Sequence, residues 1–144
     1  MGMEFLHQIP WQRLKPWLRA LLVSLVLLLL ISGFTAGLMA AACKKDRHVA
    51  EKTVRYCSIS LAAGAWADLL PLERARRSMI RLERAIALAQ AERTEEARVD
   101  FKISIDVMLR SRVSWLEEDH KRRIARLGNK QIEALWLSVL DDTD

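Results

Sequence analysis

The stretch "ALLVSLVLLLLISGFTAGLMAAAC" (residues 20–43) decides the fold of this chain, because it separates two segments of different character. It contains no charged residue, and about 20 apolar residues are enough to cross a bilayer as a helix. A helix buried in a soluble protein would show a polar face, and "ALLVSLVLLLLIS" shows none. We therefore predict a transmembrane helix at 20–43, preceded by a basic segment, 1–19, and followed by a domain outside the membrane, 44–144.

The same stretch also admits a second interpretation, as a signal peptide that is cut near Ala40. Cys43 after small residues is similar to a lipoprotein cleavage box, although Ala40 stands where a leucine is usual. The apolar run is, however, about twice as long as the apolar core of a signal peptide. The basic residues of "KKDR" (44–47) follow it as a stop-transfer flank. We expect the helix to remain as an anchor.

Small residues recur every four positions in the second half of this helix and fall along one side of it. Such strips let two helices approach closely in lipid, so we predict contact with a transmembrane helix of another membrane protein subunit. Gly and Ala are also simply common in spans, which is the alternative. The predicted packing residues are Ser32, Gly33, Ala36, Gly37, Ala40 and Ala41.

Aromatic and basic residues flank the span, as is typical of side chains at the headgroup level. We expect the segment before Pro16 to lie on the membrane surface and to contact lipids. The predicted interface residues are Trp11, Arg13, Lys15, Trp17 and Arg19 before the span, and Lys44 and Lys45 after it.

The charge distribution leaves the orientation open. Basic residues counted far into the domain favour a cytoplasmic C-terminal part, whereas those close to the span are equal on the two sides. A basic segment before a first span commonly acts as a signal anchor, so we favour a bacterial inner-membrane protein with its N-terminus inside and its domain in the periplasm. The domain carries 20 Lys and Arg against 17 Asp and Glu, too balanced for a nucleic-acid partner.

The two cysteines, Cys43 and Cys57, are predicted to form neither a metal site nor a disulfide framework, so they indicate no compartment.

The domain is predicted to be all-α. Pro71 suits the first turn of a helix, and an apolar stripe runs from Leu72 to Ala89. Thr94 is positioned to cap a second helix, and so short a link makes the two antiparallel. We expect this hairpin to pack through Leu82, Ile86, Phe101 and Ile105.

Three further segments complete the prediction. Residues 46–65 are expected to continue helically from the membrane, and helices are expected within 111–127 and 130–140, separated at Gly128-Asn129. Residues 99–107 alternate between apolar and polar, which is a strand pattern, but the Thr94 cap favours a helix.

One stretch, "RAIALAQAERTEEARVDFKIS", resembles a tetratricopeptide repeat within residues 80–109. The positions that match are Ala85, Leu88, Ala97, Phe101 and Ser104. Arg81 stands where the repeat has Trp, and Leu109 stands where it often has Pro. The resemblance implies protein or peptide binding on a helical surface, although stable arrays need about three repeats.

No catalytic, cofactor or metal site is predicted. Glu117 and His120 have the spacing of one arm of a helical di-iron site, but a second arm is missing, so we expect a solvated charged face. Four arginines could bind an anion or an acidic partner, or pair with Glu73 and Glu83 on a solvated face. They are Arg74, Arg77, Arg81 and Arg84.

These observations leave two functions, neither of them enzymatic. The chain is expected to be an accessory subunit of a membrane complex or, alternatively, an anchored adaptor whose helical hairpin recruits a soluble partner.

Overall fold

The computed structural model describes residues 15–45 and 47–143, and within them every regular element is helical. The predicted all-α class is therefore confirmed, and so is the helical alternative for residues 99–107. The elements are α1 (Pro16–Lys45), α2 (Ala50–Ala63), the 3₁₀ helix η3 (Ala65–Leu69), α3 (Pro71–Gln90), α4 (Thr94–Arg110), α5 (Ser114–Leu127) and α6 (Lys130–Asp141).

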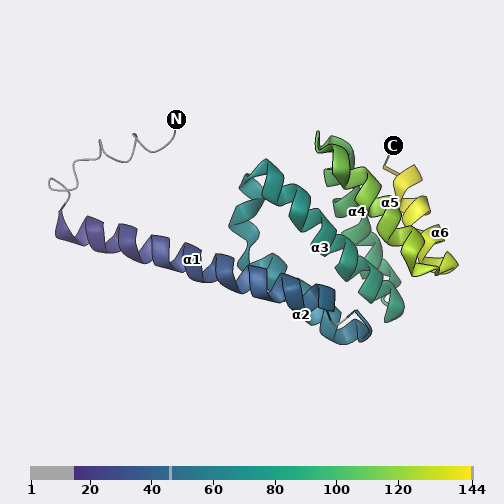
Figure 1. Ribbon diagram of the computed structural model, residues 1–144, viewed down its shortest axis with the longest axis horizontal. Helices are drawn as coiled ribbons and strands as arrows, with labels where there is room; N and C mark the ends of the chain where they lie inside the picture. Colours follow the sequence, from purple (N-terminus) through teal and green to yellow (C-terminus); the bar gives the residue numbers. More distant parts are fainter. Residues whose placement is uncertain (1–14, 46, 144) are drawn as a thin grey trace.

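The long helix α1 contains the whole predicted span, and its first half extends away from the other helices (Figure 1). It is the one helix among the described residues that is long and apolar enough to cross a membrane, and none of its most apolar 18-residue window is buried inside the protein. Of the flanking segment 1–19, Trp11 and Arg13 lie outside the described residues.

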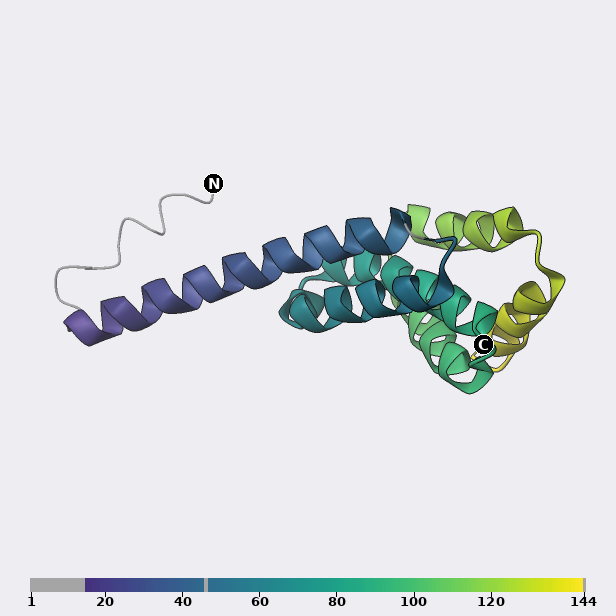
Figure 2. The same cartoon turned by 90° about the horizontal axis from the view of Figure 1, so that it is seen from below.

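The helix predicted within residues 46–65 is present, but the chain reverses direction after α1, so the prediction that this helix continues from the membrane was wrong. α2 begins at Ala50 and runs back along the second half of α1 (Figure 2). The reversal brings Cys43 opposite Cys57, with 5.1 Å between their Cα atoms, and the two form a disulfide. The prediction of no disulfide was therefore also wrong, because 14 residues span the turn between two adjacent antiparallel helices.

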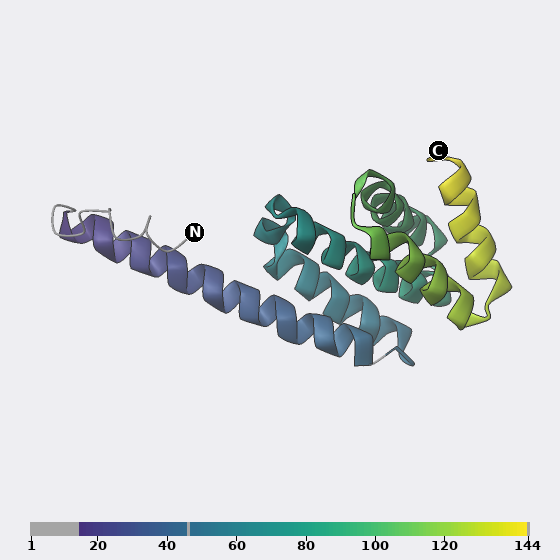
Figure 3. The same ribbon diagram turned by 45° about the horizontal axis from the view of Figure 1, so that its top comes forward.

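The hairpin of α3 and α4 forms the centre of the domain. Leu82, Ile86, Phe101 and Ile105 all lie in one buried cluster, which confirms the predicted packing. Leu72 is the exception in the predicted stripe, because it is half exposed at the start of α3. α5 and α6 follow α4 and pack against this hairpin, α6 mainly through α4 (Figure 3).

The helix ends agree with the sequence in part. Pro71 occupies the first turn of α3, as predicted. Thr94 is the first residue of α4 and makes no side-chain cap, so that prediction was wrong. Gly128 ends α5 in the left-handed conformation with φ 62°, which favours glycine. Asn129 caps the next helix instead, because its side chain accepts hydrogen bonds from Gln131 N and Ile132 N.

Because α1 to α4 run antiparallel to their neighbours, alternate connections lie at the same end of the domain. We define the proximal end as η3, the start of α3 and the end of α4 with its link to α5. This end points back toward the first half of α1 (Figures 1 and 2). We define the distal end as the turns at 47–49, 91–93 and 128–129.

Candidate functional site

The second half of α1 packs against α2 and η3 of the same chain. Ser60 Oγ donates a 2.8 Å hydrogen bond to the carbonyl oxygen of Ala36, and the Trp66 indole donates one of 2.9 Å to Ser32 Oγ. Ala40 packs on a small buried cluster that contains the disulfide. Four of the six small residues predicted to pack, Ser32, Gly33, Ala36 and Ala40, are therefore partly buried by this chain itself.

Gly64 allows this close approach at the end of α2. A Cβ atom at this position would lie 3.1 Å from the Cβ of Ala36 and would collide with the Arg77 guanidinium. Arg77 is buried here, and its Nη2 donates to the carbonyl oxygen of Leu61 at 2.8 Å. The small side chains of α1, the missing side chain of Gly64 and a buried arginine thus fit together at one place.

The other two predicted packing residues remain open. Gly37 and Ala41 are exposed, and a Cβ atom at Gly37 would meet nothing within 4 Å. Gly37 lines a groove of about 520 Å³ between α1, η3 and α3, together with Gly33 and the side chain of Ile80. A larger residue at Gly37 would therefore change the surface of α1 without disturbing the internal contacts.

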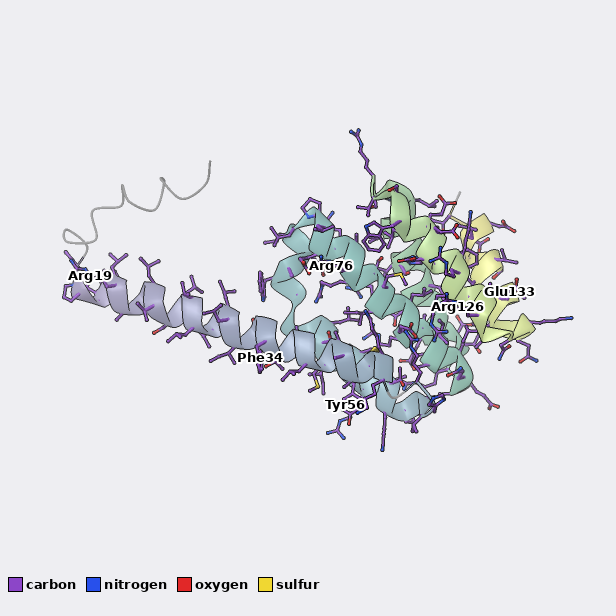
Figure 4. The ribbon with its side chains drawn as sticks, viewed as in Figure 1. Arg19, Phe34, Tyr56, Arg76, Arg126 and Glu133 are labelled. Atoms are coloured by element: carbon purple, nitrogen blue, oxygen red, sulfur yellow. A yellow bond between two sulfur atoms is a disulfide. The ribbon has the colours of Figure 1, made fainter. Side chains whose placement is uncertain are left out.

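The predicted interface residues that the structure describes lie at the two ends of α1. Lys15 lies just before the helix, and Trp17 is 59% exposed in its first turn, near Arg19 (Figure 4). Lys44 and Lys45 are exposed in the last turn. The structure thus separates the two predicted groups by the length of the helix.

The predicted arginine set is engaged within the domain. Arg77 contacts the Asp68 carboxylate, with 2.7 Å between Nε and Oδ1, and Arg84 forms a two-pronged pair with the buried Asp100. Arg74 Nε donates to the carbonyl oxygen of Asp68, and Arg81 lies 3.8 Å from the same carboxylate. These arginines therefore connect α2, η3, α3 and α4 rather than forming one open cationic patch.

Glu83 joins three parts of the chain. Its carboxylate is 3% exposed and accepts hydrogen bonds from Arg123 of α5 and from Arg47, which follows α1. The predicted placement of Glu83 on a solvated face is therefore wrong, whereas Glu73 does pair with Arg76 at the surface. A buried carboxylate needs partners of this kind, because an unpaired buried charge is costly.

His120 is fully buried, which corrects the prediction that it belongs to a solvated charged face. Its Nδ1 lies 2.8 Å from the carbonyl oxygen of Leu116, and its Nε2 lies 2.7 Å from Ser104 Oγ. Burial lowers the pKa of His120 below its ordinary value, against the opposing effects of the Leu116 carbonyl and Asp119. A neutral ring fits these contacts, with Nδ1 donating to the carbonyl and Nε2 accepting from the hydroxyl.

Sequence reasoning missed several of these residues for different reasons. Gly64 and Trp66 stand in "LAAGAWADLL", where the glycine signals only a break between helices. The disulfide and the Glu83 network join residues that are far apart in the sequence or on different helices, which no local pattern reveals.

Within residues 15–45 and 47–143, no group of three or more His, Cys, Asp or Glu side chains is arranged to hold a metal ion. Comparison with known proteins adds no identity, since no family model, curated protein or solved structure matches this chain.

Proposed function

We propose that this chain is a non-enzymatic, single-span accessory subunit of a larger membrane protein complex. The observation that carries the proposal is the open side of α1, where Gly37 and Ala41 remain exposed beside contacts that the chain makes with itself. Small residues on an exposed helix surface let another helix approach closely and gain van der Waals contact. The helical domain would then brace the neighbouring subunit outside the membrane.

The contacts of α1 favour an anchor over a removed leader. A cut within residues 40–42 would delete the α1 groups that bind Ser60 and Trp66. A cut directly before Cys43, as in a lipoprotein, would place Cys43 at a new N-terminus with a free thiol, but this sulfur is bonded to Cys57. Because α2 and η3 bind the second half of α1, its removal would leave the domain without these contacts.

The disulfide also supports one orientation. Disulfides persist in oxidising compartments such as the periplasm and are rare in the cytosol. Because Cys43 and Cys57 both lie at or beyond the end of α1 that carries the domain, the N-terminus would be inside and the domain periplasmic, in a bacterial inner membrane. An alkaline phosphatase fusion after residue 144 tests this: it should be active, and an inactive fusion would reverse the orientation.

The accessory-subunit proposal is tested by purification in a mild detergent. Gly37→Ile keeps the span apolar and leaves the internal contacts intact, so the variant should insert but lose its partner subunits in size exclusion. Leu28→Ile, at a 64% exposed position of the first half of α1, is the matched control and should retain them. If Gly37→Ile remains bound at the wild-type ratio, the open side of α1 is not the contact.

The alternative is an anchored adaptor that binds a soluble partner through the α3–α4 hairpin. It is favoured by the burial of the positions that carry the tetratricopeptide resemblance. Each of them packs inside the hairpin or between the hairpin and a neighbouring helix. These positions are Ala85, Leu88, Ala97, Phe101 and Ser104. An adaptor would be released from its partner during size exclusion, whereas a subunit would remain with its complex, so the same experiment separates the two.

A further inference from the structure

The proximal end of the domain exposes large apolar side chains. Leu69 of η3 is 81% exposed, and Leu70 and Leu72, which follow it, are each 50% exposed. Trp66 and Leu109 are also more than one-third exposed. A soluble surface rarely gathers apolar side chains in this way unless they contact a partner or a membrane.

The distal end differs in character. Its turns expose polar and charged residues, including His48, Glu92, Arg93 and Asn129, and Val49 is the large apolar side chain exposed there. The apolar exposure is therefore concentrated at the end of the domain that points along α1 toward its first half (Figure 1).

The position of the proximal end relative to a bilayer follows from its contacts with α1. Trp66 binds Ser32, so η3 lies beside the middle of the apolar run 20–43. The part of α1 before that contact, Trp17–Ile31, measures about 22 Å at about 1.5 Å per residue. This is shorter than the hydrocarbon core of a bilayer, about 30 Å. A bilayer that covered the apolar residues of α1 would therefore reach the level of η3.

The polar groups of the proximal end suit the headgroup boundary. Trp66 presents its ring with its N–H already bonded, and indole rings favour this zone. The carboxylate of Asp68 is held by Arg77, while Arg110 and Arg112 are exposed and can reach lipid phosphates. Exposed apolar side chains bordered by basic ones match the acyl chains and the phosphates of a membrane surface.

We propose that the proximal end is a second membrane contact, which inserts Trp66, Leu69, Leu70 and Leu72 at the boundary between acyl chains and headgroups of the leaflet that α1 leaves. This proposal rests on the proposed function, in which α1 crosses the bilayer. Two points of contact hold the domain in a fixed orientation on the membrane, so that its distal end faces away from the lipid.

The test uses the full-length chain in nanodiscs of phosphatidylcholine and phosphatidylglycerol, with and without bromine on the acyl chains. The emission of each tryptophan is obtained by subtracting the fluorescence of its Trp→Phe variant from that of the wild type, in nanodiscs with and without bromine. We call this difference the share of that tryptophan. Trp17 reports the span, Trp66 reports the proximal end, and the buried Trp136 of α6 is the negative control. We expect the Trp17 and Trp66 shares to lose most of their intensity and the Trp136 share to lose none.

The possible outcomes distinguish the second membrane contact from the proposal that α1 crosses the bilayer. Quenching of Trp17 without Trp66 overturns the second contact and leaves the span. Quenching of Trp66 without Trp17 supports the contact and contradicts the span. An unquenched Trp66 in a particle that holds two copies would assign the proximal end to a second copy of the chain, which also overturns the proposal.

A charged residue in place of the most exposed leucine of η3 tests directly whether that side chain enters the membrane. Leu69→Asp should reduce the Trp66 share of the quenching several-fold while the Trp17 share is unchanged. Val99→Asp, at a 59% exposed position near the start of α4, is the matched control and should leave both unchanged. Equal quenching in Leu69→Asp and Val99→Asp would show that the exposed leucine does not enter the membrane, contrary to the proposal.

Discussion

The two halves of α1 belong to one continuous helix, yet they have opposite surroundings. Side chains from Trp17 to Ile31 project on all sides, and Leu28 is 64% exposed. From Ser32 onward the helix bears small residues, and one side of it is covered by α2 and η3 up to the buried Cys43. Figure 4 shows the difference along the helix.

This difference is a consequence of side-chain size rather than polarity, since both halves are apolar. Leucines hold neighbouring backbones apart, whereas Gly, Ala and Ser let α2 approach closely enough for Ser60 to bond an α1 carbonyl. Under the proposed function, a single apolar run serves two purposes: its first half is the membrane anchor, and its second half is a structural helix of the domain.

The largest expected effect contrasts two phenylalanines. Phe101 is fully buried in the α3–α4 hairpin, while Phe34 is 71% exposed on α1. Phe101→Ala should lower the free energy of unfolding of the domain by about 3–5 kcal/mol, because it leaves a cavity. Phe34→Ala should leave that energy nearly unchanged. Thermal melts of the two variants in detergent check this, and equal melting temperatures would contradict the assignment of inside and outside.

The disulfide is the next largest contribution. Replacing Cys43 and Cys57 together with serine removes a cross-link that closes a loop of 14 residues. For a loop of this size the expected loss is about 3 kcal/mol, mainly because the unfolded chain gains freedom. Denaturant unfolding should show the loss. Free thiols that react with maleimide in the native wild type would instead show that the bond does not form.

Two glycines distinguish the covered side of α1 from its open side. Gly64→Ala forces a methyl group against Arg77 and Ala36 and should destabilise the domain by about 1–3 kcal/mol. Gly37→Ala meets open space within a helix and should stabilise it by about 0.5–1 kcal/mol. Opposite shifts in melting temperature are expected, and shifts of the same sign would mean that the two sides are not distinct.

The smallest effect is a dependence on pH from His120. Burial lowers the pKa of this group in the folded state, so below the ordinary value of about 6.5 the unfolded chain binds a proton that the folded chain does not. Stability should therefore fall as the pH decreases from about 6.5. In His120→Phe this part of the slope should disappear. A wild-type slope that persists in the variant would assign it to other groups.

Much of the fold could be predicted because its signals are local. The charge-free run, the stripe that includes Leu82 and Ile86, and the glycine that ends α5 each lie within one element. Residues 99–107 were correctly predicted as a helix even though their alternation resembles a strand, since α4 buries Phe101 and Ile105 on one side only.

The candidate site was less predictable because its contacts join distant residues. The small residues of α1 were recognised, but a pattern of small side chains does not say whether the neighbour is another protein or α2 of the same chain. Cys43 and Cys57 gave no signal until the chain reversal placed them opposite each other. The sequence places Glu83 at the surface because an amphipathic helix is expected to have one solvated face. In the structure α2, α4 and α5 all pack against α3, which leaves Glu83 buried.

The central claim is that both halves of α1 remain in the mature protein, one in the membrane and one in the domain. The most direct test is the intact mass of the protein extracted from membranes, measured before and after reduction and alkylation. We predict a chain that retains residues 1–42 and whose two cysteines become alkylated only after reduction. A chain lighter by the mass of residues 1–42, or one that begins anywhere beyond Ser32, would contradict the claim.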